Sequence, residues 1–153
     1  GKTGARIMSL ADTSKKMSKS DENQNSVVYV LDDKDTIIRK FKRAITDSDT
    51  SIVYREDKPG IMNLMDIYSV ASGKSIEEIE REFDQKGYGE FKLAVGETVA
   101  DVLAPIRERF EQLSKDKAYV DSIIKNNGEK AAYFAEKTLR KVQKKIGLPE
   151  RIR

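Results

Sequence analysis

A polar stretch near the start of the chain holds two lysines three residues apart among serine hydroxyls, in the order Lys16-Met17-Ser18-Lys19-Ser20. A lysine ammonium is a compact cation that can sit on a phosphate oxygen, and serine hydroxyls add neutral donors at short reach. The surrounding residues 11–25 are small and polar, which predicts a mobile loop that can close over a polyphosphate. This pattern indicates phosphate chemistry; a solvated lysine loop is the alternative.

Composition excludes many other kinds of site. The 153 residues contain no cysteine and no histidine, which excludes disulfides, thiolate catalysis, imidazole acid–base catalysis and Cys or His metal ligands. Gly1-Lys2-Thr3 imitates the end of a P-loop, but the glycine that this pattern needs further upstream is not present. No apolar run approaches the ~20 residues of a membrane span. Carboxylate, lysine, hydroxyl and backbone chemistry remain, and we expect no resident metal.

Apolar residues recur with helical spacing along most of the chain and predict a mainly α fold of one domain or one and a half. The predicted helices cover residues 34–45, 59–72, 76–85, 90–113, 116–125 and 129–146. Short strands are predicted over residues 5–10 and 27–31, the second because β-branched residues and a tyrosine lie between polar segments. The expected architecture is a helical bundle domain preceded by a flexible loop and a short strand.

The first helix has a clear beginning and a clear apolar stripe. Asp32 and Asp33 can cap it, because a carboxylate accepts hydrogen bonds from the free amides of the first turn. The apolar stripe includes Ile37 and Phe41. On this spacing, the basic residues that should point to solvent are Arg39, Lys40, Lys42 and Arg43.

Boundary signals separate the later helices. Ser75 and Glu78 have the spacing of a capping box. Residues 87–89 and 126–128 are rich in glycine and asparagine and predict turns. Pro105 lies inside an apolar helical pattern and predicts a kink or a break.

Positive charge gathers at the end of the chain. Residues 137–153 contain seven basic residues and one acidic residue, whereas the remaining 136 carry a net charge of −3. In the predicted last helix, an apolar stripe through Leu139 and Val142, which we expect to be buried, lies opposite a basic face formed by Lys137, Arg140, Lys141, Lys144 and Lys145. This face is either solvated or binds an anionic partner such as nucleic acid, where Tyr133 could stack on a base.

The lysine–serine loop also has a family resemblance. Residues 16–20 are identical to the second signature of the class I aminoacyl-tRNA synthetases. The chain resembles the bacterial tryptophanyl-tRNA synthetases over essentially its whole length, whereas the tyrosyl enzymes share chiefly the loop. The blocks that carry this resemblance are residues 4–10, 16–21, 31–33, 44–48, 58–61, 63–64, 73–78, 87–89 and 128–131.

The resemblance implies a tryptophan–tRNA ligase that uses ATP with Mg²⁺ to activate tryptophan and transfers it to tRNA(Trp) in the cytoplasm. It implies that Lys16 and Lys19 are catalytic, gripping the leaving pyrophosphate, and that Ile7 touches the adenosine side of ATP. The other ATP-binding residues of the loop are then Met17, Ser18 and Ser20. It further implies that the helical region receives the anticodon arm, with the basic face of residues 137–145 toward the RNA.

The resemblance also implies that the chain contains parts of two domains. The first class I signature contains histidines, and this chain has none. We therefore expect residues 1–31 to be the C-terminal edge of a Rossmann-like catalytic domain and residues 32–153 to be a helical tRNA-binding domain. On this view the chain cannot form tryptophanyl-adenylate by itself.

Two points stay open. Family members are homodimers mainly through the sheet domain, so the oligomeric state of this chain alone stays open between a monomer and a dimer. The alternatives to a synthetase are a free-standing helical nucleic-acid-binding module and an inert helical interaction domain, which salt-dependent tRNA binding would separate.

Overall fold

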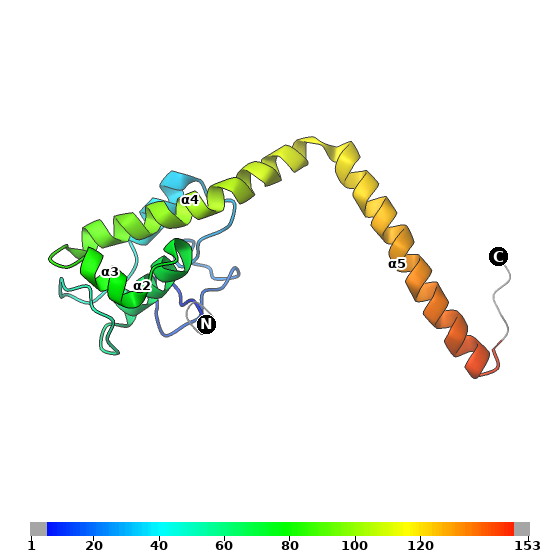
Figure 1. Cartoon of the computed structure of the whole chain (residues 1–153), viewed down its shortest axis with the longest axis horizontal. Coiled ribbons are helices and arrows are strands. Elements are labelled where there is room, and N and C mark those ends of the chain that lie inside the picture. The colour runs from blue at the N-terminus through cyan, green and yellow to red at the C-terminus, as the bar shows by residue number, and fades with distance from the viewer. Residues whose placement is uncertain (1–5, 149–153) are drawn as a thin grey trace. The chain divides into compact units, whose positions relative to one another are not determined.

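The computed structural model describes residues 6–148, so the P-loop-like residues 1–3 and the basic residues beyond 148 lie outside the described part. Within it the predicted mainly α fold is confirmed (Figure 1). The helices of this part are α1 (Lys34–Lys42), α2 (Pro59–Ser72), α3 (Ile76–Glu82), α4 (Tyr88–Lys115) and α5 (Lys117–Lys145). The chain forms two compact units, which meet between Glu108 and Arg109 within α4.

The helix ends follow local chemistry, as the sequence predicts. Asp33 Oδ1 accepts a hydrogen bond from the amide of Thr36 at 2.7 Å, and this bond lowers the pKa of the Asp33 carboxyl. Ser75 and Glu78 form the expected capping box at the start of α3. Gly73 ends α2 in the left-handed conformation, with φ of 76°, which glycine adopts without steric cost.

The core of the first unit joins all four of its helices. Tyr68, Phe83 and Phe91 form an edge-to-face cluster with ring centroids 4.9–6.0 Å apart. Gly60 lets α2 approach the preceding segment, because a Cβ there would lie on the carbonyl oxygen of Ile45. The other fully buried apolar side chains of this core are Leu10, Ile37, Phe41, Ile61, Leu64, Met65, Ile79 and Val95.

Residues 27–31 form no strand, so that prediction was wrong. Side chains satisfy the backbone of this segment in place of a neighbouring strand. The Asp32 carboxylate accepts from the amide of Tyr29 at 2.9 Å, and the carbonyl of Val27 accepts from Lys40 Nζ at 2.8 Å. In the described residues, β pairing is confined to one isolated antiparallel bridge, between Met8 and Lys16.

Lys40 is buried, contrary to the expectation that it faces solvent. Its ammonium lies 2.6 Å from Asp32 Oδ2 and 4.8 Å from the centroid of the Tyr29 ring, in addition to its bond with Val27. The segment before α1 therefore covers the side of the helix that carries Lys40. The spacing of apolar residues within α1 could not reveal this cover, because the partners lie outside the helix.

Several helix boundaries differ from the prediction, and two helices are shorter than expected. The first, α1, ends at Lys42 and not at residue 45. Residues 126–128 continue helically within α5, and α4 begins at Tyr88 instead of after a turn at 87–89. Of the kink or break predicted at Pro105, the break is absent, because α4 continues through this residue. Glycine tolerates a turn without requiring one, and its cost in a helix interior is only about 1 kcal/mol. Conversely, α3 ends at Glu82, and Gln85 takes a left-handed φ of 64°.

The second unit is built differently from the first. The stripe through Leu139 and Val142 has the predicted helical spacing, but these two side chains are 54% and 48% exposed. No residue of α5 is buried. The expectation of a buried stripe on the last helix was therefore wrong. Across residues 6–148, the structure contains no helix that combines the length and apolarity needed to cross a bilayer.

The burial of Lys40 leads to a stability prediction. Changing Lys40 to Met should lower the free energy of unfolding by about 3–5 kcal/mol, because the carboxylate of Asp32 loses its buried cation. Urea unfolding followed by the near-UV circular dichroism of the tyrosines measures this loss. Lys42 is an exposed lysine on the same helix, and Lys42→Met should change stability by no more than about 0.5 kcal/mol. Equal losses in the two variants would show that the buried ion pair is unimportant.

Candidate phosphate-binding loop and basic helix face

The lysine–serine loop begins at a short antiparallel pairing between residues 7–9 and residues 15–17. The amide of Ser9 donates to the carbonyl of Lys15 at 2.9 Å, and the amide of Met17 donates to the carbonyl of Ile7 at 3.0 Å. Ile7 and Met17 both pack against the core of the first unit. The structure thus brings Ile7, predicted from the resemblance to touch ATP, next to the start of the loop.

A buried side chain of α2 holds this pairing in place. Asn63 Oδ1 accepts from the amide of Met8 at 2.9 Å, and Asn63 Nδ2 donates to the carbonyl of Met8 at 3.1 Å. The carboxamide therefore takes the place of a neighbouring strand. Leu10 extends the anchor, since its amide donates to Ser26 and its carbonyl accepts from Ile45. Nothing in the spacing of residues around Asn63 predicts this role, because its partner lies 55 residues away in the sequence.

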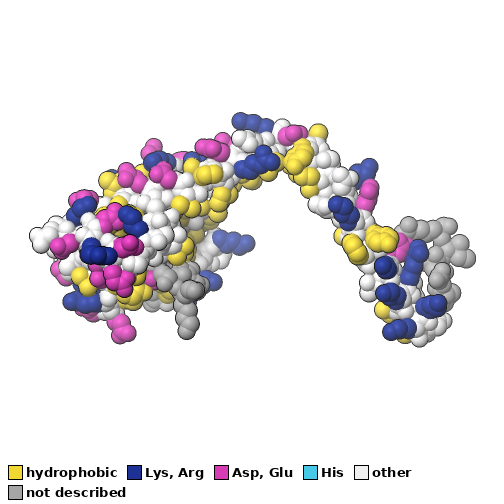
Figure 2. All heavy atoms as spheres, viewed as in Figure 1, with side chains coloured by type: hydrophobic (Ala, Val, Ile, Leu, Met, Phe, Trp, Pro, Cys, Tyr) yellow, Lys and Arg dark blue, Asp and Glu magenta, His cyan; other side chains and the backbone are white. Residues whose placement is uncertain are grey.

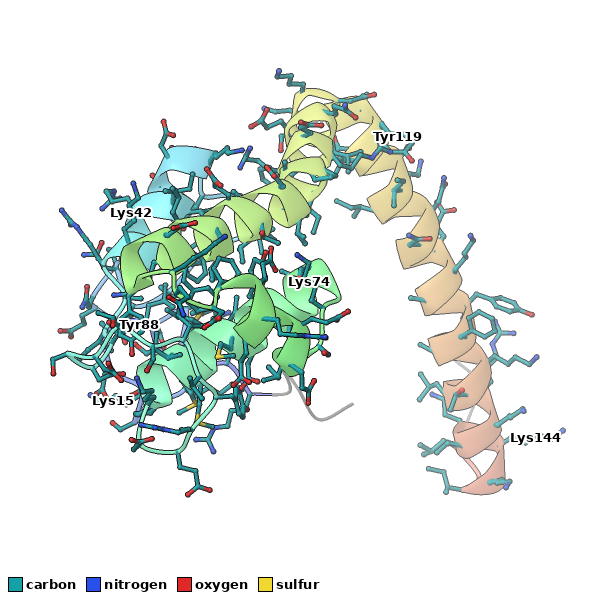
Figure 3. The ribbon with its side chains drawn as sticks, turned by 60° about the vertical axis from the view of Figure 1, so that its left-hand side comes forward. Lys15, Lys42, Lys74, Tyr88, Tyr119 and Lys144 are labelled. Carbon is teal, nitrogen blue, oxygen red and sulfur yellow. The ribbon has the colours of Figure 1, made fainter. Side chains whose placement is uncertain are left out.

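The turn that joins the paired segments is also fixed by hydrogen bonds. The hydroxyl and the amide of Ser14 donate to Asp12 Oδ1 at 2.6 and 3.1 Å, and Lys15 Nζ lies 3.1 Å from Asp12 Oδ2. These contacts, the Ser14 hydroxyl first among them, lower the pKa of the Asp12 carboxyl. Lys15, labelled in Figure 3, is thus engaged within the turn.

The two lysines predicted to bind phosphate remain available. The side chains of Lys16 and Lys19 are exposed, and none of the ion pairs found among residues 6–148 includes either of them. The hydroxyls of Ser18 and Ser20, on either side of Lys19 in the sequence, lie 3.0 Å apart. The backbone is tethered, because the Tyr29 hydroxyl donates to the carbonyl of Lys19 at 3.2 Å. Fixed backbone with free ammonium groups suits the binding of a polyanion.

The predicted basic face lies on the C-terminal half of α5, where dark blue side chains gather in Figure 2. Arg140 makes a 3.1 Å ion pair with Glu136 one turn earlier. Lys144 marks this end of the helix in Figure 3. The five residues of the face, Lys137, Arg140, Lys141, Lys144 and Lys145, are all exposed. Their shared position on one side of the helix gives a cationic face that can contact phosphates.

An aromatic pair adjoins this basic face on the same helix. The rings of Tyr133 and Phe134 pack edge to face with centroids 5.5 Å apart, and the residues are 62% and 65% exposed. Together with Asn126, Glu129 and Lys130 they line a shallow hollow. Exposed rings beside lysines can stack on unpaired bases. The sequence analysis singled out Tyr133 but missed Phe134, whose position on an exposed helix is a tertiary feature.

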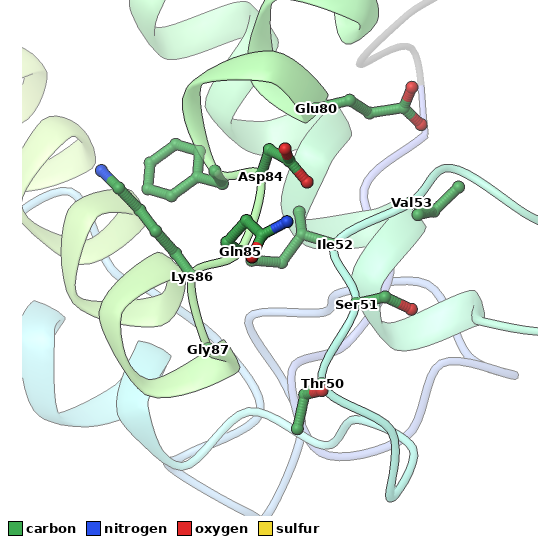
Figure 4. A pocket seen from close by; sticks show the side chains of 10 residues that line it. Thr50, Ser51, Ile52, Val53, Glu80, Asp84, Gln85, Lys86 and Gly87 are labelled. Carbon is green, nitrogen blue, oxygen red and sulfur yellow. The ribbon is translucent and has the colours of Figure 1, made fainter.

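A separate hollow of about 470 Å³ lies beside the α3–α4 connection (Figure 4). None of the predicted site residues lines it; its lining is Thr50, Ser51, Ile52, Val53, Glu80, Phe83, Asp84, Gln85, Lys86 and Gly87.

A buried lysine lies near the start of α2. The ammonium of Lys58 lies 2.5 Å from Asp49 Oδ2 and donates to the Tyr88 hydroxyl at 2.9 Å. The Lys58 hydrogen bond lowers the pKa of the Asp49 carboxyl. These contacts tie the segment before α2 to the start of α4. The described residues include no cluster of three or more acidic side chains suited to a metal ion.

The chain is similar to known proteins in its sequence and in its fold. The family model described as tRNA synthetases class I (W and Y) matches residues 2–104. The tryptophan–tRNA ligase of Halalkalibacterium halodurans is 50% identical over 148 residues, which cover 96% of this chain and 44% of that protein. The tryptophan–tRNA ligase of Clostridium perfringens is 46% identical over 147 residues, again 96% of this chain and 44% of the relative.

The structural comparison agrees with the sequence comparison. The crystal structure of tryptophanyl-tRNA synthetase from Mycoplasma pneumoniae matches with a TM-score of 0.78 at 30% identity, and the match covers 97% of this chain and 45% of that one. The chain thus spans a little under half the length of the relatives that it matches.

The anchoring role of Asn63 can be tested by hydrogen exchange. Asn63→Leu keeps a similar side-chain volume but can neither donate to nor accept from Met8. The amide of Met8 should exchange with solvent about tenfold to a hundredfold faster in this variant, because one to two buried hydrogen bonds are lost. NMR-detected exchange of the Met8 and Met17 amides measures the effect. Asn127→Leu, an exposed change on α5, is the control. Unaltered exchange in Asn63→Leu would show that α2 does not hold the loop base.

Proposed function

This chain belongs to the class I tRNA synthetases for tryptophan and tyrosine, and we propose that it is part of a tryptophan–tRNA ligase. Within that ligase it supplies the loop that grips pyrophosphate and the helices that bind tRNA(Trp). The observation that carries the proposal is the anchored loop, which pairs with the backbone of Ile7 at its base and leaves the side chains of Lys16 and Lys19 exposed. The choice of tryptophan over tyrosine is supported by curated relatives that are 50% and 46% identical.

The reaction has two steps. A carboxylate oxygen of tryptophan attacks the α-phosphorus of ATP, and the bond from that phosphorus to the oxygen bridging to the β-phosphate breaks. Pyrophosphate leaves with the bonding electrons, and tryptophanyl-adenylate remains. The 3′-terminal hydroxyl of tRNA(Trp) then attacks the acyl carbon and AMP leaves. Mg²⁺ enters with ATP as part of the substrate.

The loop contributes to the first step through electrostatics. Negative charge builds on the β- and γ-phosphates as the bond to the α-phosphorus breaks. Cations that hold this charge more tightly in the transition state than in bound ATP accelerate the step. Lys16 and Lys19 supply these cations, Ser18 and Ser20 add hydroxyl donors, and Met17 anchors the loop to the core. Ile7 contacts the adenosine side of ATP.

The helical part serves the tRNA. The basic face of α5 neutralises phosphates of the anticodon arm, and Tyr133 and Phe134 offer rings for unpaired bases. We assign residues 1–31 to the edge of the catalytic domain and residues 32–153 to the tRNA-binding domain of the ligase. The ligase acts in the cytoplasm as a homodimer.

The catalytic role of the loop predicts a large loss of activity in two variants. Lys16→Ala and Lys19→Ala should each slow tryptophan-dependent ATP–pyrophosphate exchange by about 10²–10³-fold in the ligase polypeptide that contains this chain. The loss should fall on kcat more than on the KM for tryptophan, because the contact strengthens in the transition state.

The neighbouring Lys15 provides a matched control. It is exposed and its ammonium is engaged by Asp12, so Lys15→Ala should change exchange by no more than about threefold. Normal exchange in both Lys16→Ala and Lys19→Ala would refute the proposed role of the loop. The free-standing RNA-binding alternative predicts no exchange in any variant.

The tRNA-binding role predicts a change in salt dependence. Replacing Lys141, Lys144 and Lys145 together by Ala should weaken tRNA(Trp) binding and reduce the slope of log affinity against log salt by about three, one per lysine. Filter binding at several salt concentrations measures both effects. A triple change at Lys34, Lys42 and Lys86 removes the same charge from within residues 32–153 but outside the basic face of α5, and it should leave the slope nearly unchanged. Equal affinity of the α5 variant and the unmodified protein at low salt would place these lysines outside the interface.

A further inference from the structure

The backbone of the lysine–serine loop is hydrogen-bonded to a side chain from outside the loop, that of Tyr29. The hydroxyl of Tyr29 donates to the carbonyl oxygen of Lys19 at 3.2 Å, across ten residues of chain. The contact joins the backbone at the very residue whose side chain carries one of the two free ammonium groups. A bond to this carbonyl restricts rotation of the adjoining peptide, and so restricts the direction in which the Lys19 side chain leaves the backbone.

Tyr29 is itself held from two sides. Its amide donates to Asp32 Oδ2 at 2.9 Å, and the amide of Asp32 donates back to the carbonyl of Tyr29 at 3.1 Å. The ammonium of Lys40 lies under the ring, 4.8 Å from its centroid, and pairs with the same Asp32 oxygen at 2.6 Å. Lys40 and Asp32 are largely buried, with side chains 4% and 15% exposed. The ring therefore rests on a fixed ion pair at the start of the helical part.

The support continues into α4. Arg107 donates to the carbonyl of Asp32 at 2.8 Å, so the turn that carries Tyr29 is linked to α1 through Lys40 and to α4 through Arg107. Lys40 has no free access to a ligand, because its ammonium already meets a carboxylate, a carbonyl and a ring. Its charge therefore stabilises Tyr29 and does not contact phosphate.

We propose that Tyr29 is a positioning residue for the reaction: its hydroxyl, supported by the Lys40–Asp32 pair, orients Lys19 toward the leaving pyrophosphate. This inference rests on the proposed function of the loop. It assigns to Tyr29 an effect that operates through Lys19 and requires no contact between Tyr29 and any substrate.

A double-mutant cycle on the ligase polypeptide that contains this chain tests the proposal. Tyr29→Phe removes the hydroxyl but keeps the ring over Lys40. The kcat of ATP–pyrophosphate exchange should fall by about three- to tenfold, the value of one neutral hydrogen bond, with the KM for tryptophan unchanged. In the Lys19→Ala background the same change should have no effect, since no ammonium remains to be oriented.

The control and the competing outcomes are distinct. Tyr119→Phe removes an exposed hydroxyl from the second unit and should leave exchange unchanged, and the melting temperatures of all variants should agree within a few degrees. Undiminished kcat in Tyr29→Phe overturns the proposal, as does a loss that is the same with and without Lys19, because that loss would be general scaffolding. If Lys19→Ala itself exchanges normally, the proposed function fails; if only Tyr29→Phe is normal, the function stands and the positioning role fails.

Discussion

A buried ammonium organises the part of the molecule that carries the loop. An unpaired charge in an interior is too costly to persist, so Lys40 of α1 must keep its partners. Those partners, Asp32, the carbonyl of Val27 and the ring of Tyr29, all belong to the segment just before the helix. The segment therefore has no regular secondary structure and is still held tightly against α1. From it Tyr29 reaches the backbone of the loop, so that the Lys40–Asp32 ion pair links α1 to the lysine–serine loop.

A second polar anchor works from the other side of the loop. Asn63 gives Met8 both a donor and an acceptor, as a neighbouring strand would, and the pairing of residues 7–9 with 15–17 begins there. The loop is thus fixed at its base and at Lys19, while the ammonium groups of Lys16 and Lys19 stay exposed. This combination suits the binding of a polyanion, because ordering long side chains on a tethered backbone costs less entropy than ordering a whole loop. Electrostatic catalysis depends on such preorganisation.

The two units pose different physical problems. The first closes an apolar core around three interlocked aromatic rings. The second presents both an apolar stripe and a basic face on α5, with no residue of that helix buried. Helical spacing separates the two faces correctly, but spacing reports only which residues share a side. Whether a side is covered depends on elements that a helix does not contain. For this reason the basic face was predicted accurately and the burial of the opposite stripe was not.

The sequence alone determined the features that arise within a few residues: the mainly α fold, the caps at Asp33 and Ser75, the glycine end of α2, and the lysine–serine signature that indicated both phosphate chemistry and the family. Tertiary structure decided the rest. Lys40 and Asn63 contact partners 13 and 55 residues away, and the backbone of residues 27–31 pairs with side chains instead of a strand. The physical reason is the sequence separation of the interacting groups. A helix cap binds amides within a few residues, whereas a buried polar group needs hydrogen-bond partners that only the folded chain places beside it.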